Sequence, residues 1–373
     1  MRYTLVSCIF DIQKRSQSSG KRTGVTYADL FNYVNDIGLP TILFVESHLI
    51  DKIKKRDGLV IVPKNLEDLD TYKLINSMSN LKKPHNAQNL NPWFTSVINS
   101  KLSLMKEALQ YVEDSDTSHL VWIDAGIAHV GTIPKDKFIE DISINLYPDK
   151  ITLVMMKATT ANEIENLPEY YNYNRGKIAA GLSIVPITLI NWFESSVKEL
   201  FNKAILEFNI MCLEEQFMSV LTVKYPQIFE YIFSDYWLLY NLRYISDRIR
   251  TVIMNLIYCR SNGLTHMGSK ILKQLLKSLE YSKTTCSINE FCEILYNGQI
   301  IEYYVNKNLS KKLGLFLGYL YYNNTDGNKW MQQYLDNIKN NLKFVDINLL
   351  DPLLFTNEKI LLIDDTKLLW CVH

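Results

Sequence analysis

The stretch HLVWIDAGIAHV, residues 119–130, places a single carboxylate, Asp124, directly after a short apolar run and follows it with a small residue and Gly126. A short apolar run that ends in a polar residue is typical of a strand buried in a sheet. Gly126 lets the backbone turn sharply and allows a bulky charged ligand to approach without meeting a Cβ atom. The stretch therefore predicts a buried strand that ends at a carboxylate facing a ligand.

Similar apolar runs alternate with helical patterns through the first two thirds of the chain. Apolar residues at three- and four-residue spacing predict a helix from Tyr27 to Ile37 and another over residues 97–112. Near-continuous apolar strands separated by helices predict an α/β fold with a mainly parallel sheet flanked by helices. Ligands of such sheets bind at the carboxyl ends of the strands, where Asp124 is expected. The expected strands are residues 3–10, 40–46, 59–63, 119–124, 151–156 and 181–186.

The pattern changes after about residue 245, where apolar residues recur at helical spacing with few strand-like runs. We therefore expect one domain over residues 1–250 and a mostly helical C-terminal region over residues 251–373. Asp364 and Asp365 lie between two apolar runs, where Asp and Thr favour a hairpin turn. They are not assigned to catalysis.

Composition excludes several classes of function. The 40 basic and 40 acidic residues balance, so no overall field favours a polyanion, and nucleic acid is not expected as a partner. The six cysteines are scattered without the spacing of a zinc site and are expected to be reduced thiols. The longest apolar run, LGLFLGYLYY, is about half a membrane span, so no transmembrane segment and a cytoplasmic location are expected.

Taken alone, Asp124 supports two interpretations. It is either a solvated aspartate in the turn after a strand or part of a site for a metal ion and a diphosphate. In the second case, a nucleotide sugar would release a nucleoside diphosphate, and a hard divalent cation held by aspartate oxygens would neutralise the charge that develops.

Further segments occur in an order that resembles one known family. WIDAGIAHV (residues 122–130) followed by EEQ (residues 214–216) is the most specific part, and the match extends over about residues 3–245. The chain thus resembles the HtrL/YibB family, which is regarded as a family of glycosyltransferases with the GT-A nucleotide-sugar fold. The supporting segments are TLVSCIFDIQKR, TYADLFNYVNDIGLPTILFVE, the lysine of NSKLSLMKEAL, KIAAGLSIVP and LEEQFMSVLTVKYPQIFEYIFSDYW.

The resemblance implies roles for particular residues. Asp124 would contact the metal ion or the ribose, and Lys101 would approach the diphosphate. Glu214 or Glu215 would deprotonate the acceptor hydroxyl. The remaining contacts implied for the donor are Phe10 and Asp11 beside the base, Gly126 at the turn, and Ala180 and Gly181 along the donor or acceptor sugar.

One departure concerns the metal ion. Many GT-A enzymes carry two aspartates at the spacing D-x-D, whereas Gly126 takes the second position here. His129 or Asp235 could complete the site for Mn²⁺ or Mg²⁺. A histidine in such an apolar stretch is, however, more often a buried, hydrogen-bonded residue than a metal ligand.

Other candidates also have ordinary explanations. Lys101 could be a solvated lysine of an amphipathic helix, and the two glutamates could simply favour the first turn of a helix. Arg175 and Lys177 flank Gly176 in NRGK, which could grip phosphate or form an exposed turn. Tyr236 and Trp237 fit core positions better than a sugar platform.

The leading hypothesis is therefore a glycosyltransferase that uses a nucleotide sugar, with a UDP sugar favoured, and a glycan or glycoconjugate acceptor. A non-catalytic member that binds a glycan or a protein is the alternative, motivated by the missing second aspartate. A metal-dependent phosphodiesterase would need clustered acidic or histidine ligands that the expected strands do not present. Residues 251–373 would shape the acceptor side or form a homo-oligomer contact.

Overall fold

The computed structural model describes residues 2–12, 23–87, 90–112, 116–130 and 135–234, with a few positions between 255 and 268 and three short strands nearer the C-terminus. The chain forms two compact units, residues 1–242 and 243–373. The large sheet and the candidate site belong to the first unit.

The first unit is built on a seven-stranded sheet with the order β3-β2-β1-β4-β6-β5-β7. Six strands run in the same direction, and β6 runs against both of its neighbours. The predicted α/β fold with a mainly parallel sheet is thus confirmed. The strands are β1 (Arg2–Ile9), β2 (Thr41–Val45), β3 (Leu59–Pro63), β4 (Thr117–Ile123), β5 (Ile151–Met155), β6 (Ile178–Pro186) and β7 (Phe229–Phe233).

The reversed direction of β6 follows from its connection. A parallel neighbour requires the chain to cross back to the other end of the strands. After β5 the chain instead forms α6 (Ala161–Ile164) and α7 (Leu167–Tyr171). It then enters β6 at the same end of the sheet at which β5 stops. The first half of β6 therefore lies beside the carboxyl end of β4, where the Asp124 N–H donates to the Gly181 carbonyl at 2.9 Å.

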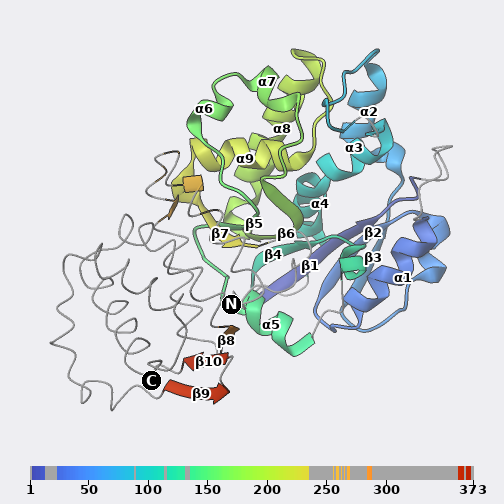
Figure 1. Cartoon of the computed structure of the whole chain (residues 1–373). Coiled ribbons are helices and arrows are strands. Elements are labelled where there is room, and N and C mark those ends of the chain that lie inside the picture. Colours follow the sequence, from blue (N-terminus) through green and yellow to red (C-terminus); the bar gives the residue numbers. More distant parts are fainter. Residues whose placement is uncertain are drawn as a thin grey trace. The chain divides into compact units, whose positions relative to one another are not determined.

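Helices cover both faces of the sheet (Figure 1). One face packs against α1 (Gly24–Asn35) and α5 (Lys135–Ser143), and the other against α4 (Lys101–Ala108), α8 (Ile187–Leu206) and α9 (Glu214–Lys224). The remaining helices are α2 (Asp70–Ser77), α3 (Pro92–Asn99), and the short 3₁₀ turns η1 (Ser47–Lys52), η2 (Leu66–Asp68), η3 (Leu109–Tyr111), η4 (Ile127–Val130) and η5 (Pro226–Ile228).

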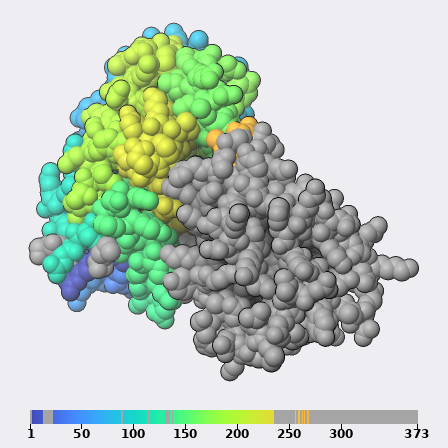
Figure 2. Space-filling view, turned by 90° about the vertical axis from the view of Figure 1, so that its left-hand side faces the viewer, coloured from blue at the N-terminus to red at the C-terminus, as the bar shows by residue number. Residues whose placement is uncertain are grey.

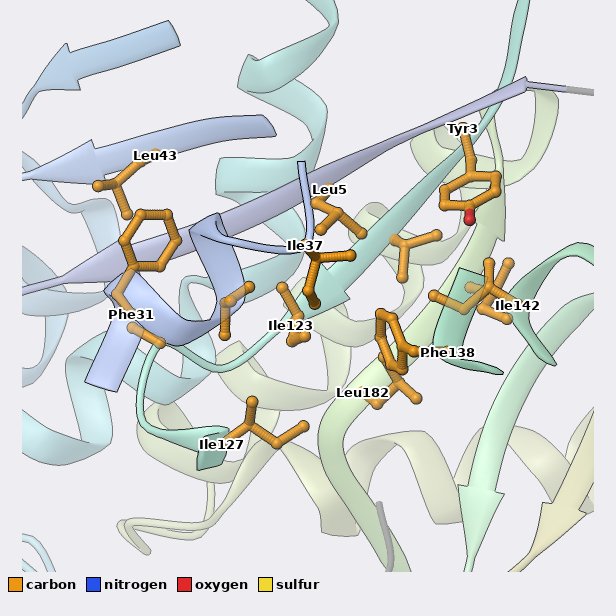
Figure 3. Packing of buried hydrophobic residues seen from close by; sticks show 14 of the residues in the cluster. Tyr3, Leu5, Phe31, Ile37, Leu43, Ile123, Ile127, Phe138, Ile142 and Leu182 are labelled. Carbon is orange, nitrogen blue, oxygen red and sulfur yellow. The ribbon is translucent and has the colours of Figure 1, made fainter. Parts of the chain in front are cut away.

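The core beneath α1 and α5 is formed by side chains from both layers (Figure 3). Phe31 of α1 and Phe138 of α5 are fully buried against Leu5, Ile123 and Leu182 of the strands. These strands carry apolar residues on both faces, which is why their sequences read as continuous apolar runs.

The helix predicted over residues 97–112 is divided at Ser100. The Ser100 N–H donates to the Val97 carbonyl, and its Oγ donates to the Ser96 carbonyl at 2.8 Å. A serine hydroxyl bonded one turn back competes with the backbone ladder and bends a helix. As a result α3 ends at Asn99 and a separate helix, α4, begins at Lys101.

The second unit is described only in part. Its three-stranded antiparallel sheet consists of β8 (Thr284–Ser287), β10 (Lys367–Trp370) and β9 (Ile360–Asp364). The pairing of β9 with β10 agrees with the hairpin expected at Asp364 and Asp365. The expected helical character of residues 251–373 falls largely outside the described residues.

Within the part of the chain that the structure describes, no helix has both the length and the apolar character needed to cross a membrane.

Replacing Phe31 by Ala is expected to lower the free energy of unfolding of the first unit by about 3–5 kcal/mol, because a fully buried aromatic side chain is lost. Urea denaturation followed by circular dichroism measures the change. Tyr33 lies on the same helix and is 62% exposed, so Tyr33→Ala should change the value by about 0.5 kcal/mol or less. Equal losses in the two variants would contradict the buried face assigned to α1.

Candidate functional site

A pocket of about 190 Å³ lies where the carboxyl ends of β1 and β4 meet the first residues of α4 and α9. Its lining combines apolar and aromatic side chains with a small group of charged ones, which is typical of ligand sites. The charged and titratable lining residues are Lys101, Asp124, His129, Glu214 and Glu215, and the aromatic ones are Phe10, Tyr27, Phe94 and Trp122.

The Lys101 ammonium is at the centre of the charged group. Its Nζ lies 2.9 Å from Asp124 Oδ1 and 2.7 Å from Glu214 Oε1, and it donates to the Ala180 carbonyl at 3.0 Å. An ammonium has three N–H donors, so these three acceptors satisfy it. The side chain is only 7% exposed, which excludes the alternative of a solvated lysine. Contact with a diphosphate remains a prediction and would require one acceptor to be exchanged.

Asp124 directly follows the carboxyl end of β4, as the sequence predicted. Its Oδ1 also accepts a hydrogen bond of 2.7 Å from Trp122 Nε1. Its Oδ2 has no hydrogen-bond partner among the described residues, and the side chain is 38% exposed. One oxygen is thus fixed by the protein, while the other remains available to a ligand.

Glu214 and Glu215 form the first turn of α9, where acidic residues favour the helix dipole. Adjacent helical residues point about 100° apart. Glu214 is buried and bound to Lys101, whereas Glu215 is half-buried and its Oε1 accepts the Ala180 N–H at 3.4 Å. The two carboxylates lie in one site but have different surroundings.

The groups of this cluster shift one another's pKa values. Burial acts to lower the pKa of Lys101, but the charges of Asp124 and Glu214 raise it overall, so the lysine is protonated. Burial raises the pKa of Glu214, although the Lys101 ammonium opposes this. Burial, and next the charge of Glu214, raise the pKa of Glu215 from 4.5 to about 8. Glu215 therefore holds a proton at neutral pH and releases it in weakly alkaline solution.

Phe10 and Asp11 are separated by the structure. Phe10 is buried and lines the pocket. The Asp11 carboxylate instead accepts the Gly24 N–H at the start of α1, at 3.3 Å, and lies 3.6 Å from His48 Nε2. The N-terminus of a helix attracts a carboxylate, which explains this position. The expected contact of Asp11 with a nucleotide base remains a prediction.

Gly126 and the backbone of β6 form part of the pocket wall. A Cβ atom on Gly126 would lie 2.6 Å from Tyr27 Cε1, so glycine is needed for the tyrosine to pack here. Gly181 lines the pocket directly. Ala180 is buried and contributes its backbone carbonyl and N–H to Lys101 and Glu215.

The described residues do not form a site for a divalent cation. No group of three His, Cys, Asp or Glu side chains that could hold a metal ion occurs among them. Asp124 Oδ1 contacts the Lys101 ammonium, and His129 Nδ1 is hydrogen-bonded to the Gly126 carbonyl. Asp235, the other expected ligand, lies outside the described residues.

Several pocket residues were not predicted. Trp122 precedes Asp124 by two positions, and side chains two apart on a strand share a face, so this partner could have been found from the sequence. Tyr27 and Phe94 come from separate helices, and the sequence gives no sign that they meet. Cys8 also lines the pocket, and burial raises the pKa of its thiol well above the usual range, so it is not an activated nucleophile.

Comparison with known proteins identifies the family. The family described as "Bacterial protein of unknown function (HtrL_YibB)" matches residues 42–244, more than half of the chain. The chain belongs to this family, as the sequence resemblance predicted. No protein with a curated description matches it.

Solved structures with a similar arrangement include a glycosyltransferase and a synthase. A glycosyltransferase involved in the glycosylation of the major capsid of PBCV-1 is 13% identical, with 62% of this chain and 81% of that chain covered and a TM-score of 0.32. The 4-diphosphocytidyl-2C-methyl-D-erythritol synthase from Anaerococcus prevotii DSM 20548 is 12% identical, with 63% and 90% covered and a TM-score of 0.34.

Lys101→Met is expected to lower the free energy of unfolding by about 3–5 kcal/mol, because it leaves the buried Glu214 carboxylate without its counter-charge. Adding Glu214→Gln should recover part of this loss. Lys73→Met removes an exposed lysine that lies 3.9 Å from Asp70, so it should cost about 1 kcal/mol or less. Chemical denaturation of the four proteins tests this, and a Lys101→Met loss as small as that of Lys73→Met would show that the ion pair is not a buried one.

Proposed function

We propose that this member of the HtrL/YibB family is a glycosyltransferase of GT-A type. It would move a sugar from a nucleoside-diphosphate donor, with a UDP sugar favoured, to a hydroxyl of a glycan or glycoconjugate. The observation that carries the proposal is the convergence of Asp124, Glu214 and Glu215 around the buried Lys101 ammonium in an aromatic-lined pocket. This pocket lies at the carboxyl edge of the sheet, where α/β folds of this kind bind ligands.

Asp124 would bind the donor through its available oxygen. Carboxylate oxygens accept hydrogen bonds from ribose or sugar hydroxyls. Because Lys101 and Trp122 hold Oδ1, the orientation of this pocket-lining carboxylate is set before a ligand arrives. Such preorganisation is what a positioning carboxylate needs.

Glu215 would be the catalytic base. A general base works best when its pKa lies near the operating pH, and the pKa of Glu215 is raised to about 8. Glu214 is less suited, because its Oε1 is bound to the Lys101 ammonium at 2.7 Å. In the proposed step, the acceptor hydroxyl gives its proton to Glu215 as its oxygen bonds to the anomeric carbon of the donor, and the bond to the nucleoside diphosphate breaks.

The leaving diphosphate needs positive charge nearby. Lys101 is the first residue of α4 and Glu214 the first of α9, so the positive ends of two helix dipoles face the cluster. Mn²⁺ or Mg²⁺ would neutralise a diphosphate, but among the described residues no group of three His, Cys, Asp or Glu side chains could hold such an ion. No step is therefore derived through a metal ion, and donor binding should be measured with and without Mn²⁺.

A non-catalytic role is the second candidate, since Gly126 replaces the second aspartate of the D-x-D spacing. Slow hydrolysis of a nucleotide sugar in the presence of Mn²⁺ separates the two. A binding protein would leave the donor intact, whereas a transferase releases the nucleoside diphosphate when water replaces the acceptor.

Asp124→Asn is expected to abolish stabilisation by the donor without unfolding the protein. A ligand at 100 times its dissociation constant adds about 2.7 kcal/mol to the stability of the folded state. Thermal unfolding with a panel of nucleotide sugars should therefore show a UDP sugar raising the Tm of the original protein but not that of the variant. Asp70→Asn, at a side chain 71% exposed, is the control and should respond like the original. Equal stabilisation of all three proteins would refute the role of Asp124.

Glu215→Gln is expected to lower turnover by about two to four orders of magnitude with little change in donor affinity, because only the proton transfer is lost. In the original protein the base must lose its proton, so the rate should rise with pH through about 8, and this rise should be absent in the variant. Steady-state rates between pH 6 and pH 9 provide the measurement. A Gln variant as fast as the original would place the base elsewhere.

A further inference from the structure

Among the residues that the structure describes, Arg175 has no charged partner. It lies in the segment between α7 and β6, and its guanidinium carbon is 5.0 Å from the ring centre of Tyr170 and 5.8 Å from that of Tyr173. The guanidinium forms no ion pair or hydrogen bond among the described residues, and its Nε is buried without a partner. By contrast, the Arg56 guanidinium donates to several carbonyl and side-chain oxygens. The Nε is closed off from solvent, but the two terminal amino groups are not among the buried atoms, and the half-buried side chain leaves them open to an acceptor from outside the chain.

Lys177 lies close enough to Arg175 for their charges to interact. Lys177 lies 2.8 Å from its partner Glu163, which leaves that carboxylate engaged. The pKa of Lys177 is lowered, first by burial and further by the nearby charges of Lys157 and Arg175. The charges of Lys157 and Arg175 thus both lie close enough to Lys177 to act on it.

The segment that carries Arg175 is held in one conformation. Asn86 Nδ2 donates to the Asn174 carbonyl, and the Asn174 N–H donates to Asn86 Oδ1, both at 2.7 Å. Gly176 has a φ of +52°, a conformation that other residues rarely adopt. Gln216 of α9 donates to the Tyr173 carbonyl at 2.8 Å. These bonds fix the approach to Arg175 before any ligand binds.

Two hydrogen bonds link the segment that carries Arg175 to the surroundings of the proposed catalytic base, one from Gln216 to the Tyr173 carbonyl and one from the Ala180 N–H to Glu215. Gln216 directly follows Glu215, and the Ala180 N–H donates to Glu215. Arg175 precedes Ala180 by five residues, so their Cα atoms are at most about 18 Å apart. Figure 2 shows the segment of α6 and α7, in green, at the surface beside the later helices in yellow-green and yellow. An acceptor of more than one sugar unit could reach from Glu215 to Arg175.

We propose that Arg175 binds an oxyanion of the acceptor, so that the acceptor is an acidic glycan whose carboxylate or phosphate lies against the guanidinium. The planar guanidinium matches both groups through two parallel N–H···O bonds. Tyr173, 45% exposed and 5.1 Å from the His85 ring, offers an aromatic surface beside it for a sugar ring. This inference rests on the proposed function, because it assigns the second substrate of the same site.

Binding of three related sugars to the full chain tests the proposal. Glucuronic acid, glucose 6-phosphate and glucose differ in the group that Arg175 would recognise. Hydrogen bonds to charged groups contribute about 1.5–3 kcal/mol, so isothermal titration should show one acidic sugar bound about 10- to 100-fold more tightly than glucose. The acid that binds more tightly distinguishes a carboxylate from a phosphate.

Variants assign the preference to Arg175. Arg175→Met should reduce the preference to about one, and Arg175→Lys should keep part of it, because a lysine retains the charge without the planar fork. Lys203 lies 5.7 Å from the Phe208 ring and belongs to α8, so Lys203→Met is a matched control and should bind like the original. A Tm measurement for each variant shows that it is folded.

Equal affinities for glucose and both acids, or a preference that survives in folded Arg175→Met, would overturn the proposal. Donor binding is measured on the same samples with UDP. If UDP stabilises the protein and no acidic sugar is preferred, the acceptor inference fails while the transferase remains. If an acidic sugar binds through Arg175 and no nucleotide binds at Asp124, the anion site stands and the transferase proposal fails.

Discussion

The buried ammonium group of Lys101 connects three separate elements of the fold near the carboxyl end of β4. It binds the carboxylate that follows β4, the first carboxylate of α9 and the backbone carbonyl of Ala180 in β6. A cation removed from water in this way is stable only if its donors are satisfied by charged or polar acceptors. The position of each surrounding group therefore depends on the others. This arrangement positions the available oxygen of Asp124 and the half-buried side chain of Glu215.

Two features of the backbone bring these groups together. The break at Ser100 ends α3 and starts a new helix at Lys101, so the lysine projects from a helix terminus instead of from the middle of a longer helix. The reversed direction of β6 brings the Ala180 backbone to the carboxyl edge, beside Asp124. In a wholly parallel sheet, this end of β6 would lie at the opposite edge, and Lys101 would lack its third acceptor.

The sequence predicted six of the seven strands of the large sheet, because their apolar runs are long and bounded by polar residues. It did not predict β7, whose short run Phe229–Phe233 is interrupted by Glu230. It also placed Asp124 at a strand end, since the carboxylate follows the apolar run directly. It could not reveal the direction of β6, because a strand buried on both faces has the same composition whichever way it runs. The sequence did not indicate that Lys101 is buried either, since a lysine on an amphipathic helix is normally exposed to solvent. The contact of Asp11 with the start of α1 was also not predictable, because only the fold brings this helix end close to Asp11.

A crystal structure of the protein with UDP tests the central claim most directly. The account predicts a nucleotide in the pocket beside Phe10 and Tyr27, with a ribose hydroxyl or a phosphate-bound cation contacting Asp124 Oδ2 and Lys101 still bound to Glu214. A nucleotide bound away from this pocket, with Asp124 making no contact to it, would contradict the account.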